Sequence, residues 1–239
     1  MNIILASAEM FNNIDKNLDT LTRLVIENRN ADLIVFGEVF LHGFDALKWS
    51  FEKDKSIALS IDSEEIDKIK DLANQHNIAI SFSFFEKYNG NIYTSNIVID
   101  KNGGIIDLYH RVSPTWTIEN VSEEYKSGDN FHTFELMGKS ILVAVCGDLW
   151  FDKYIKRINK LKPDIILWPL YIDYSVDEWE SKALEEYNQR ASMLCAPVLM
   201  VNSYMRDSKG AVGGAYLFSQ GKVMKSLNLG DIGSLSVTF

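Results

Sequence analysis

The sequence is poor in cysteine and has no long uncharged apolar segment, and each shortage excludes a class of protein. Only 2 cysteines, Cys146 and Cys195, occur among 239 residues, so a disulfide framework is not expected. No segment approaches the roughly 18 apolar residues of a membrane-spanning helix. The amino-terminal residues lack a basic segment, and Glu9 interrupts their apolar stretch too early for a secretory signal. We therefore expect a cytoplasmic protein that does not bind membranes.

Clusters of positive charge and the spacings typical of metal ligands are also missing. The chain carries 24 Lys and Arg residues against 33 Asp and Glu residues, a formal net charge of −9. Binding to nucleic acid or to an anionic membrane requires clustered basic side chains, and no basic run occurs. The 4 histidines are scattered, and neither Cys-x-x-Cys nor His-Glu-x-x-His is present. The sequence therefore predicts no nucleic-acid partner and no metal site.

What the sequence does contain is an alternation of short apolar runs with amphipathic segments. Hydrophobic residues make up 46% of the chain, which is enough for a large core. The alternation predicts an α/β fold, and because no linker or repeat interrupts it, we expect one domain over residues 1–239. The expected strands are 2–8, 33–36, 78–85, 91–100, 104–109, 132–136, 140–145, 164–168, 197–202 and 215–218. The expected helices are 13–28, capped by Asn13 or Asp15, and 63–75, 152–162 and 177–194.

The segment with the most chemical information runs from an apolar strand directly into Cys146-Gly147-Asp148. A side chain at such a strand-to-helix elbow faces the carboxyl end of the sheet, where α/β folds place their ligands. Free backbone N–H groups there can receive an oxyanion, and a helix N-terminus would lower the pKa of the thiol. In general, a free cysteine after an apolar strand is more often a small buried hydrophobe. Cys195, inside an expected helix, fits that description better than Cys146.

A thiol nucleophile requires a base and a group that holds developing charge, and two further strand ends offer them. Glu38 follows strand 33–36 among apolar neighbours, and burial should raise its pKa, which suits a general base. The alternative is an ordinary solvated carboxylate at a strand end. Arg111 also ends a strand and could stabilise an oxyanion, although a lone arginine there is more often a surface ion-pair partner. His110 should point to the opposite side of the strand, because successive side chains alternate.

Taken together, Gly37-Glu38, Tyr109-His110-Arg111 and Cys146-Gly147-Asp148 resemble, in order and spacing, the nitrilase superfamily of carbon–nitrogen hydrolases. Segments 91–96 and 164–169 are similar to other strands of that family, and the resemblance covers essentially the whole chain. It implies a nitrilase-type α-β-β-α sandwich that acts without a cofactor. It also implies cleavage of a small amide or N-carbamoyl compound, and pairing of two copies into a homodimer or a higher homo-oligomer.

One position departs from the family, which has lysine where this chain has Arg111. Arginine keeps the positive charge and can donate to an oxyanion, but it does not shuttle a proton. Many members also carry a second glutamate in the loop before the nucleophile. Glu119, Glu123 and Glu124 all lie in the irregular stretch 111–129, and we favour Glu123 for that role.

Several further residues are candidates for the substrate pocket. Gly147 would supply a backbone N–H to the oxyanion, and Asp148 would orient its neighbours rather than react. Four aromatic residues are candidates for the pocket wall, although bulky aromatic side chains could equally belong to the core. These four are Trp116, Trp150, Trp168 and Tyr171.

Three functions remain open on these residues. The first is an amidase-type hydrolase in which Glu38 activates Cys146 and Arg111 holds the oxyanion. The second is an amide-forming acyltransferase on the same site, with an amine in place of water. The third is a non-catalytic binding protein on this fold, motivated by the arginine at position 111.

Overall fold

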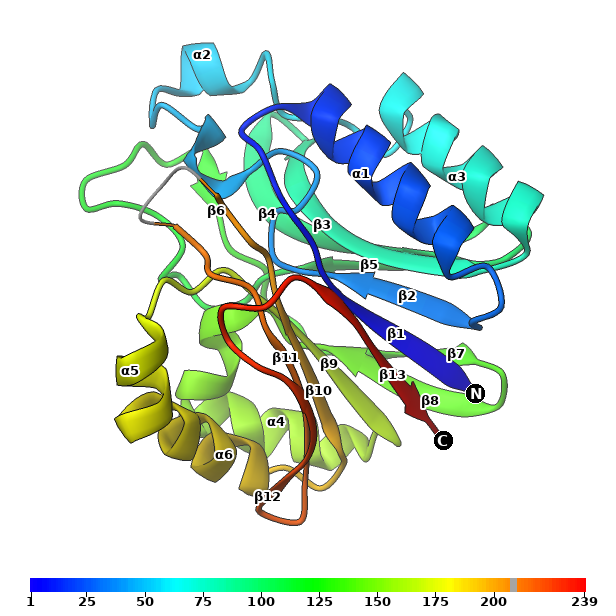
Figure 1. Cartoon of the computed structure of the whole chain (residues 1–239). Coiled ribbons are helices and arrows are strands. Elements are labelled where there is room, and N and C mark those ends of the chain that lie inside the picture. The colour runs from blue at the N-terminus through cyan, green and yellow to red at the C-terminus, as the bar shows by residue number, and fades with distance from the viewer. Residues whose placement is uncertain (207–209) are drawn as a thin grey trace.

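The strands form two sheets that lie face to face between two layers of helices (Figure 1). This computed structural model describes residues 1–206 and 210–239. The first sheet contains, in spatial order, β13 (Gly233–Thr238), β1 (Asn2–Ser7), β2 (Leu33–Phe36), β3 (Ala79–Tyr88), β4 (Asn91–Ile99) and β5 (Ile105–His110), with β6 (Tyr125–Lys126) paired to β4. The second contains β12 (Lys222–Leu227), β11 (Ala215–Ser219), β10 (Val198–Asn202), β9 (Ile165–Leu170), β8 (Lys139–Val143) and β7 (Thr133–Leu136). The predicted α-β-β-α sandwich is confirmed.

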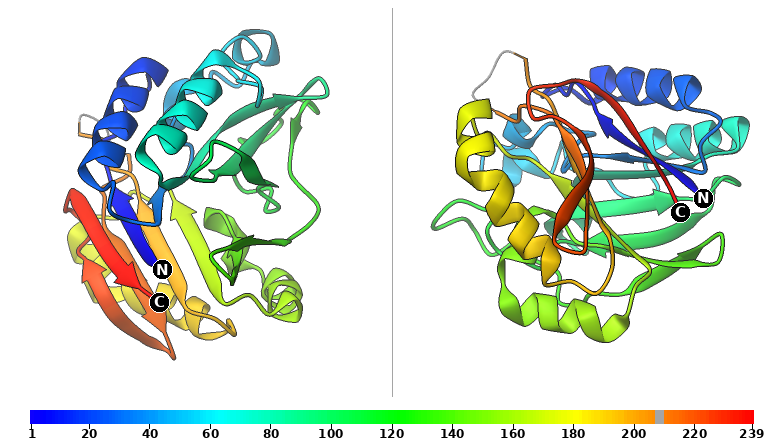
Figure 2. Two further views of the ribbon diagram at one scale, coloured as in Figure 1. Left: turned by 90° about the vertical axis from the view of Figure 1, so that its right-hand side faces the viewer. Right: turned by 60° about the horizontal axis from the view of Figure 1, so that its bottom comes forward.

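The helices cover the outer faces of the two sheets, as the edge-on view in Figure 2 shows. The first sheet is covered by α1 (Ile14–Glu27) and α3 (Glu64–His76). The second is covered by α4 (Asp152–Leu161), α5 (Val176–Glu178), the π-turn η3 (Trp179–Ala183) and α6 (Leu184–Ser192). Short helices η1 (Phe44–Ala46), α2 (Phe51–Asp54) and η2 (Cys146–Trp150) lie in the connections. Asn13 caps α1, because its side-chain oxygen accepts from the backbone N–H of Lys16 at 2.9 Å.

Strand β1 shows why the apolar runs of the sequence are nearly continuous. Its residues Ile3 and Leu5 pack into the core between the two sheets. The alternate residues Ile4 and Ala6 pack against the helices outside. Because side chains alternate along a strand, a sheet covered on both faces needs apolar residues at every position.

Two expectations need correction. The long helix expected over 177–194 is divided by the π-turn at Trp179–Ala183 and ends at Ser192, so Cys195 is exposed in the bend that follows it. Strand β13 was not among the expected strand ranges. It pairs antiparallel with β1, and this pairing brings the two ends of the chain side by side (Figures 1 and 2). Only one of its residues, Val237, is buried, which explains its weak apolar pattern.

The strand directions place three chain segments at one edge of the sandwich. Strands β2 and β3 are parallel, and β5 runs the same way because β3, β4 and β5 are successively antiparallel. The residues after β2 and β5 therefore leave the first sheet at the same edge. In the second sheet, β8 and β9 are parallel, and η2 follows β8. The carboxyl ends of these strands carry the candidate residues.

Candidate active site

Glu38, Arg111 and Cys146 meet at this edge, although they are far apart in the sequence. Arg111 Nη1 donates to Glu38 Oε1 at 2.5 Å, and both side chains are at most 3% exposed. The Cys146 thiol lies close enough to interact with both the Glu38 carboxylate and the Arg111 guanidinium. The structure therefore brings together the three residues predicted to act as base, cation and nucleophile.

The backbone is strained next to two of these side chains. Cys146 has φ 44°, and Val39, which directly follows Glu38, has φ 49°. Residues other than glycine rarely adopt this region, and each such residue costs about 1–3 kcal/mol. At these residues the chain turns sharply, shortly after β2 and β8 end. The backbone N–H of Glu38 donates to Leu170 O at 3.0 Å and thereby ties the first sheet to β9 of the second.

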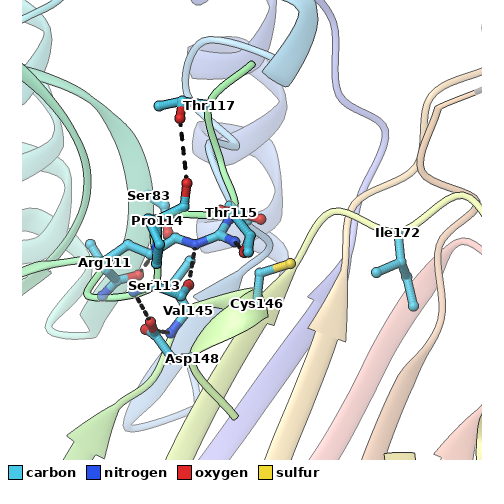
Figure 3. A network of polar contacts seen from close by, with 12 residues as sticks. Ser83, Arg111, Ser113, Pro114, Thr115, Thr117, Val145, Cys146, Asp148 and Ile172 are labelled. Carbon is cyan, nitrogen blue, oxygen red and sulfur yellow. Dashed lines mark hydrogen bonds and ion pairs between the residues drawn. The ribbon is translucent and has the colours of Figure 1, made fainter. Parts of the chain in front are cut away.

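Two hydroxyl groups that follow Arg111 hold its guanidinium. Arg111 Nε donates to Ser113 Oγ at 2.8 Å, and Nη2 donates to Thr115 Oγ1 at 2.7 Å. Figure 3 shows the guanidinium between these residues, with the Cys146 sulfur pointing away toward Ile172. His110 takes no part in this cluster, since its Nε2 lies 2.7 Å from Glu86 Oε2.

Asp148 connects the nucleophile turn to the segment after β5. Its fully buried carboxylate accepts from the backbone N–H of Val145 at 2.8 Å and from that of Ser113 at 2.7 Å. It also accepts from the hydroxyl of Tyr109 at 2.6 Å. These contacts fit the predicted orienting role, because one carboxylate fixes the turn that carries Cys146 relative to the residue two positions after Arg111.

Burial dominates the electrostatics of the site. It raises the pKa of Glu38, as predicted, although the Arg111 charge opposes the shift. Burial, the largest single influence, would lower the pKa of Arg111, but the negative charges of Glu38, Cys146 and Asp148 together outweigh it and the net shift is upward. The pKa of Cys146 is raised to about 12, first by burial and then by the Glu38 charge. The expected lowering by a helix N-terminus is therefore wrong: these two effects exceed any stabilisation that the short η2 turn supplies. Burial therefore favours the neutral thiol of Cys146, and the surrounding negative charges favour the charged form of Arg111.

Three of the predicted pocket residues lie against the nucleophile. A Cβ built on Gly147 would be 2.6 Å from Arg111 Nη2, so the guanidinium lies directly on the glycine. Trp168 is fully buried and its indole N–H donates to Cys146 O at 2.9 Å, so it supports the turn from behind. The backbone of Tyr171 lies close enough to the Cys146 thiol to oppose the rise of its pKa.

The structure does not bring the other predicted residues to this cluster. Trp116 is buried in a separate apolar group, where its ring lies near Trp49 and Tyr125. Trp150 is partly exposed and packs edge-on against Tyr187. Glu123 is exposed, and within residues 1–206 and 210–239 no ion pair or hydrogen bond joins it to Arg111 or Cys146. Its role stays a prediction from the resemblance.

Ser113 and Thr115 are contacts of Arg111 that the sequence analysis missed. The available signal was two hydroxyl side chains two and four residues after the basic residue, flanking Pro114. No periodicity marks them, because the segment is irregular and their role depends on how the loop folds back onto Arg111.

The described part of the chain shows neither a metal-binding cluster nor a helix that could span a membrane. No group of three or more His, Cys, Asp and Glu side chains in residues 1–206 and 210–239 is placed to hold a metal ion. No helix in the same residues is both long and apolar enough to cross a membrane.

The family model for carbon–nitrogen hydrolases matches residues 5–228, which is most of the sequence. The chain belongs to the carbon–nitrogen hydrolase family. Among curated members, it is 28% identical over 171 residues to a citrullinase from Francisella tularensis, covering 67% of this chain and 58% of the citrullinase. It is 24% identical over 159 residues to a glutamine-dependent NAD(+) synthetase from Acinetobacter baylyi, covering 65% of this chain and 28% of the synthetase. The chain thus spans less than two thirds of the length of either relative.

Solved structures of the family share this fold at low sequence identity. A CN-hydrolase superfamily protein from Xanthomonas campestris, with an arsenic adduct in its active site, superposes with a TM-score of 0.80 at 19% identity over 99% of this chain and 89% of that one. A mutant amidase from Nesterenkonia sp. AN1, carrying acrylamide at its active-site cysteine, has a TM-score of 0.78 at 16% identity over 100% of this chain and 93% of that one. These likenesses support the nitrilase-type sandwich.

Proposed function

We propose that this protein is a cofactor-free thiol hydrolase that cleaves a non-peptide C–N bond of a small amide or N-carbamoyl compound. The observation that carries the proposal is the meeting of a carboxylate, a fixed guanidinium and a thiol at Glu38, Arg111 and Cys146. A base, a cation and a nucleophile are the groups that acyl transfer requires. Membership of the family supports the class of bond. The names of similar proteins include a citrullinase, nitrilases and an amidase, so they favour a C–N bond without selecting a substrate.

The first half of the reaction forms an acyl-enzyme. Glu38 Oε1 accepts a hydrogen bond from Arg111. Oε2 is buried, and no donor among the described residues lies at an ordinary hydrogen-bond distance and angle from it. We assign Oε2 as the atom that takes the thiol proton as the sulfur of Cys146 attacks the substrate carbonyl carbon. The C–S bond forms, and the carbonyl electron pair moves to oxygen. Arg111 and a backbone N–H near Gly147 stabilise that oxyanion.

The second half releases the products. The tetrahedral intermediate collapses, the C–N bond breaks, and Glu38 returns its proton to the leaving nitrogen. Glu38 then takes a proton from water as the water oxygen attacks the thioester carbon. The second tetrahedral intermediate collapses, the C–S bond breaks to release the acid, and Glu38 returns this proton to the sulfur, which restores the Cys146 thiol. Arg111 exchanges no proton, because the nearby carboxylate keeps its pKa above the ordinary arginine value. An amine in place of water would yield an amide, which is the acyltransferase alternative.

The test is intact-protein mass and product analysis after incubation with a panel of small amides, omega-amides and N-carbamoyl compounds. Cys146→Ala is compared with Cys195→Ala, which removes the exposed second cysteine and serves as the matched control. An acyl adduct and product in the wild type and in Cys195→Ala, and neither in Cys146→Ala, would support the proposal. Normal turnover in Cys146→Ala would refute it. Partition of product toward added amines would identify the transferase.

A third outcome points to the non-catalytic protein. It would be an inert wild type together with activity that appears only in Arg111→Lys. The homo-oligomeric state and the cytoplasmic location stay predictions, which size-exclusion chromatography with light scattering and cell fractionation would test.

A further inference from the structure

The contacts of Arg111 show how an arginine is accommodated at the position of the family's lysine. A guanidinium carries five N–H donors. In the described residues, one donor from Nη1 goes to Glu38, the Nε donor goes to Ser113, and one donor from Nη2 goes to Thr115. One N–H on Nη1 and one on Nη2 are left over. The guanidinium thus retains two donors for an oxyanion while its orientation is set by three others.

The pairing with Glu38 uses one carboxylate oxygen only. Arginine and carboxylate groups frequently pair through two parallel hydrogen bonds, because the two planar forks match. Here only Oε1 accepts from Arg111, and Oε2 has no partner of ordinary geometry in residues 1–206 and 210–239. A bidentate pair would occupy both oxygens and remove the base from the reaction. The hydroxyls of Ser113 and Thr115 hold the guanidinium in the orientation that leaves Oε2 free.

The Arg111 guanidinium and the hydroxyls of Ser113 and Thr115 pack tightly against the turn that carries Cys146. A Cβ on Gly147 would lie 2.4 Å from Thr115 Oγ1, 2.6 Å from Arg111 Nη2 and 2.8 Å from Ser113 Oγ. Glycine at this position is therefore what lets the guanidinium and both hydroxyls reach the residue beside Cys146. Asp148 sets the position of the segment, since its carboxylate binds the backbone N–H of Ser113.

We propose that Ser113 and Thr115 are positioning residues that hold Arg111 in single-point contact with Glu38, so that an arginine can serve this site. The inference rests on the proposed function. Without the hydroxyls, the guanidinium would close on Glu38 as a bidentate pair. The free base oxygen would be lost, and the cation would move away from the thiol. The charged and titratable groups that act on Glu38 are Arg111, Cys146 and Asp148, and only the first is expected to move.

The test uses iodoacetamide as a probe of Cys146 in a Cys195→Ala background, so it requires no substrate. Thr115→Val removes the hydroxyl and keeps the shape, and Thr115→Ser restores the hydroxyl. Because Thr115 is exposed, both variants are expected to fold. We expect the alkylation rate at pH 7 to fall about tenfold in Thr115→Val, since losing one hydrogen bond to a charged group shifts an equilibrium by that order. Thr115→Ser should recover most of the rate. The control is Thr117→Val, which removes a partly exposed hydroxyl of the same loop that, within the described residues, hydrogen-bonds only to the Pro114 carbonyl, and it should leave the rate unchanged.

Repeating Thr115→Val in an Arg111→Lys background separates positioning from a general structural role. A lysine has no fork to pair bidentately, so the valine substitution should there change the rate less than about threefold. With any substrate that acylates the enzyme, the acid limb of kcat/KM should shift to lower pH in Thr115→Val, because a bidentate guanidinium lowers the pKa of Glu38.

Equal rates for wild type and Thr115→Val would overturn the inference, as would an equal loss in Thr115→Ser or in the lysine background. Failure of the proposed function has a different signature. In that case no panel compound acylates the wild type, while the dependence of alkylation on the Thr115 hydroxyl persists.

Discussion

Replacing Gly147 by alanine tests the geometry of the site with the smallest possible change. The added methyl group would lie 2.6 Å from Arg111 Nη2, whereas an ordinary contact is about 3.4 Å or more. The guanidinium must therefore retreat by about 0.8 Å, the difference between the two distances. Thr115 Oγ1, at 2.4 Å, must retreat further. Gly147 does not adopt a left-handed backbone conformation, so the expected cost of Gly147→Ala is steric.

The displacement gives the size of the expected effect. A misplacement of about 1 Å in a catalytic group can cost about 100-fold in rate. We therefore expect kcat/KM to fall by about 100-fold in Gly147→Ala, which corresponds to about 2.7 kcal/mol of transition-state stabilisation. Overpacking of a buried position costs about 1–3 kcal/mol of folding free energy, so the variant should still fold.

The assay is single-turnover acylation of Cys146, together with urea unfolding of the same samples. Gly104→Ala is the matched control, because the atoms nearest to its added Cβ belong to the Asp100 side chain, the closest at 3.3 Å, in the β4–β5 hairpin. In an Arg111→Lys background the alanine should cost less, since the crowded Nη2 atom is gone. Wild-type acylation in Gly147→Ala would refute the placement of the guanidinium against this glycine.

Three further predictions follow from buried carboxylates and from one histidine. Asp148→Asn leaves one side-chain oxygen to accept from the three donors of Tyr109, Ser113 and Val145. We expect the free energy of unfolding in urea to fall by about 1–3 kcal/mol and the alkylation of Cys146 to slow. Unchanged stability would contradict this. Because the pKa of Glu38 is raised, kcat/KM should fall with decreasing pH through a midpoint above the ordinary glutamate value, and a midpoint at or below that value would count against Glu38 as the base. The hydrogen bond to Asp107 raises the pKa of the half-exposed His132 in the folded protein. The contribution of this contact to folding stability is therefore complete below the pKa of histidine in the unfolded chain, and it is lost as the pH rises through the higher pKa of the folded state. His132→Gln should therefore lose stability, by less than about 1 kcal/mol, at pH 5.5 but not at pH 8.5 in urea unfolding.

The strands and helices were largely predictable because their causes are local. Strand 33–36 was predicted with the bounds of β2, and Asn13 caps α1 through its own side chain. Strand β13 was missed, because its side chains are mostly exposed and only its pairing with β1 makes it a strand. The break at Trp179–Ala183 was missed for a related reason, since an amphipathic pattern does not distinguish a π-turn from an α-helical one.

The family was predicted from the resemblance of Gly37-Glu38, Tyr109-His110-Arg111, Cys146-Gly147-Asp148 and other segments over the whole chain, and the family model matches. That Glu38, Arg111 and Cys146 each follow a strand is consistent with their meeting at one edge of the sheets. The sequence did not predict the direction of the Cys146 pKa shift. That shift depends on burial and on the nearby Glu38 charge, which are properties of the packed site.

The residue types and their positions after strands could therefore be read from the sequence, as could the presence of arginine at position 111. The tertiary structure alone shows that this arginine meets Glu38 through a single oxygen and that Ser113 and Thr115 hold it there. It also shows that a side chain at residue 147 would displace Arg111, Ser113 and Thr115. The physical reason is that hydrogen bonds and close contacts depend on distances of a few tenths of an ångström between distant segments. Local patterns of hydrophobicity carry no information at that scale.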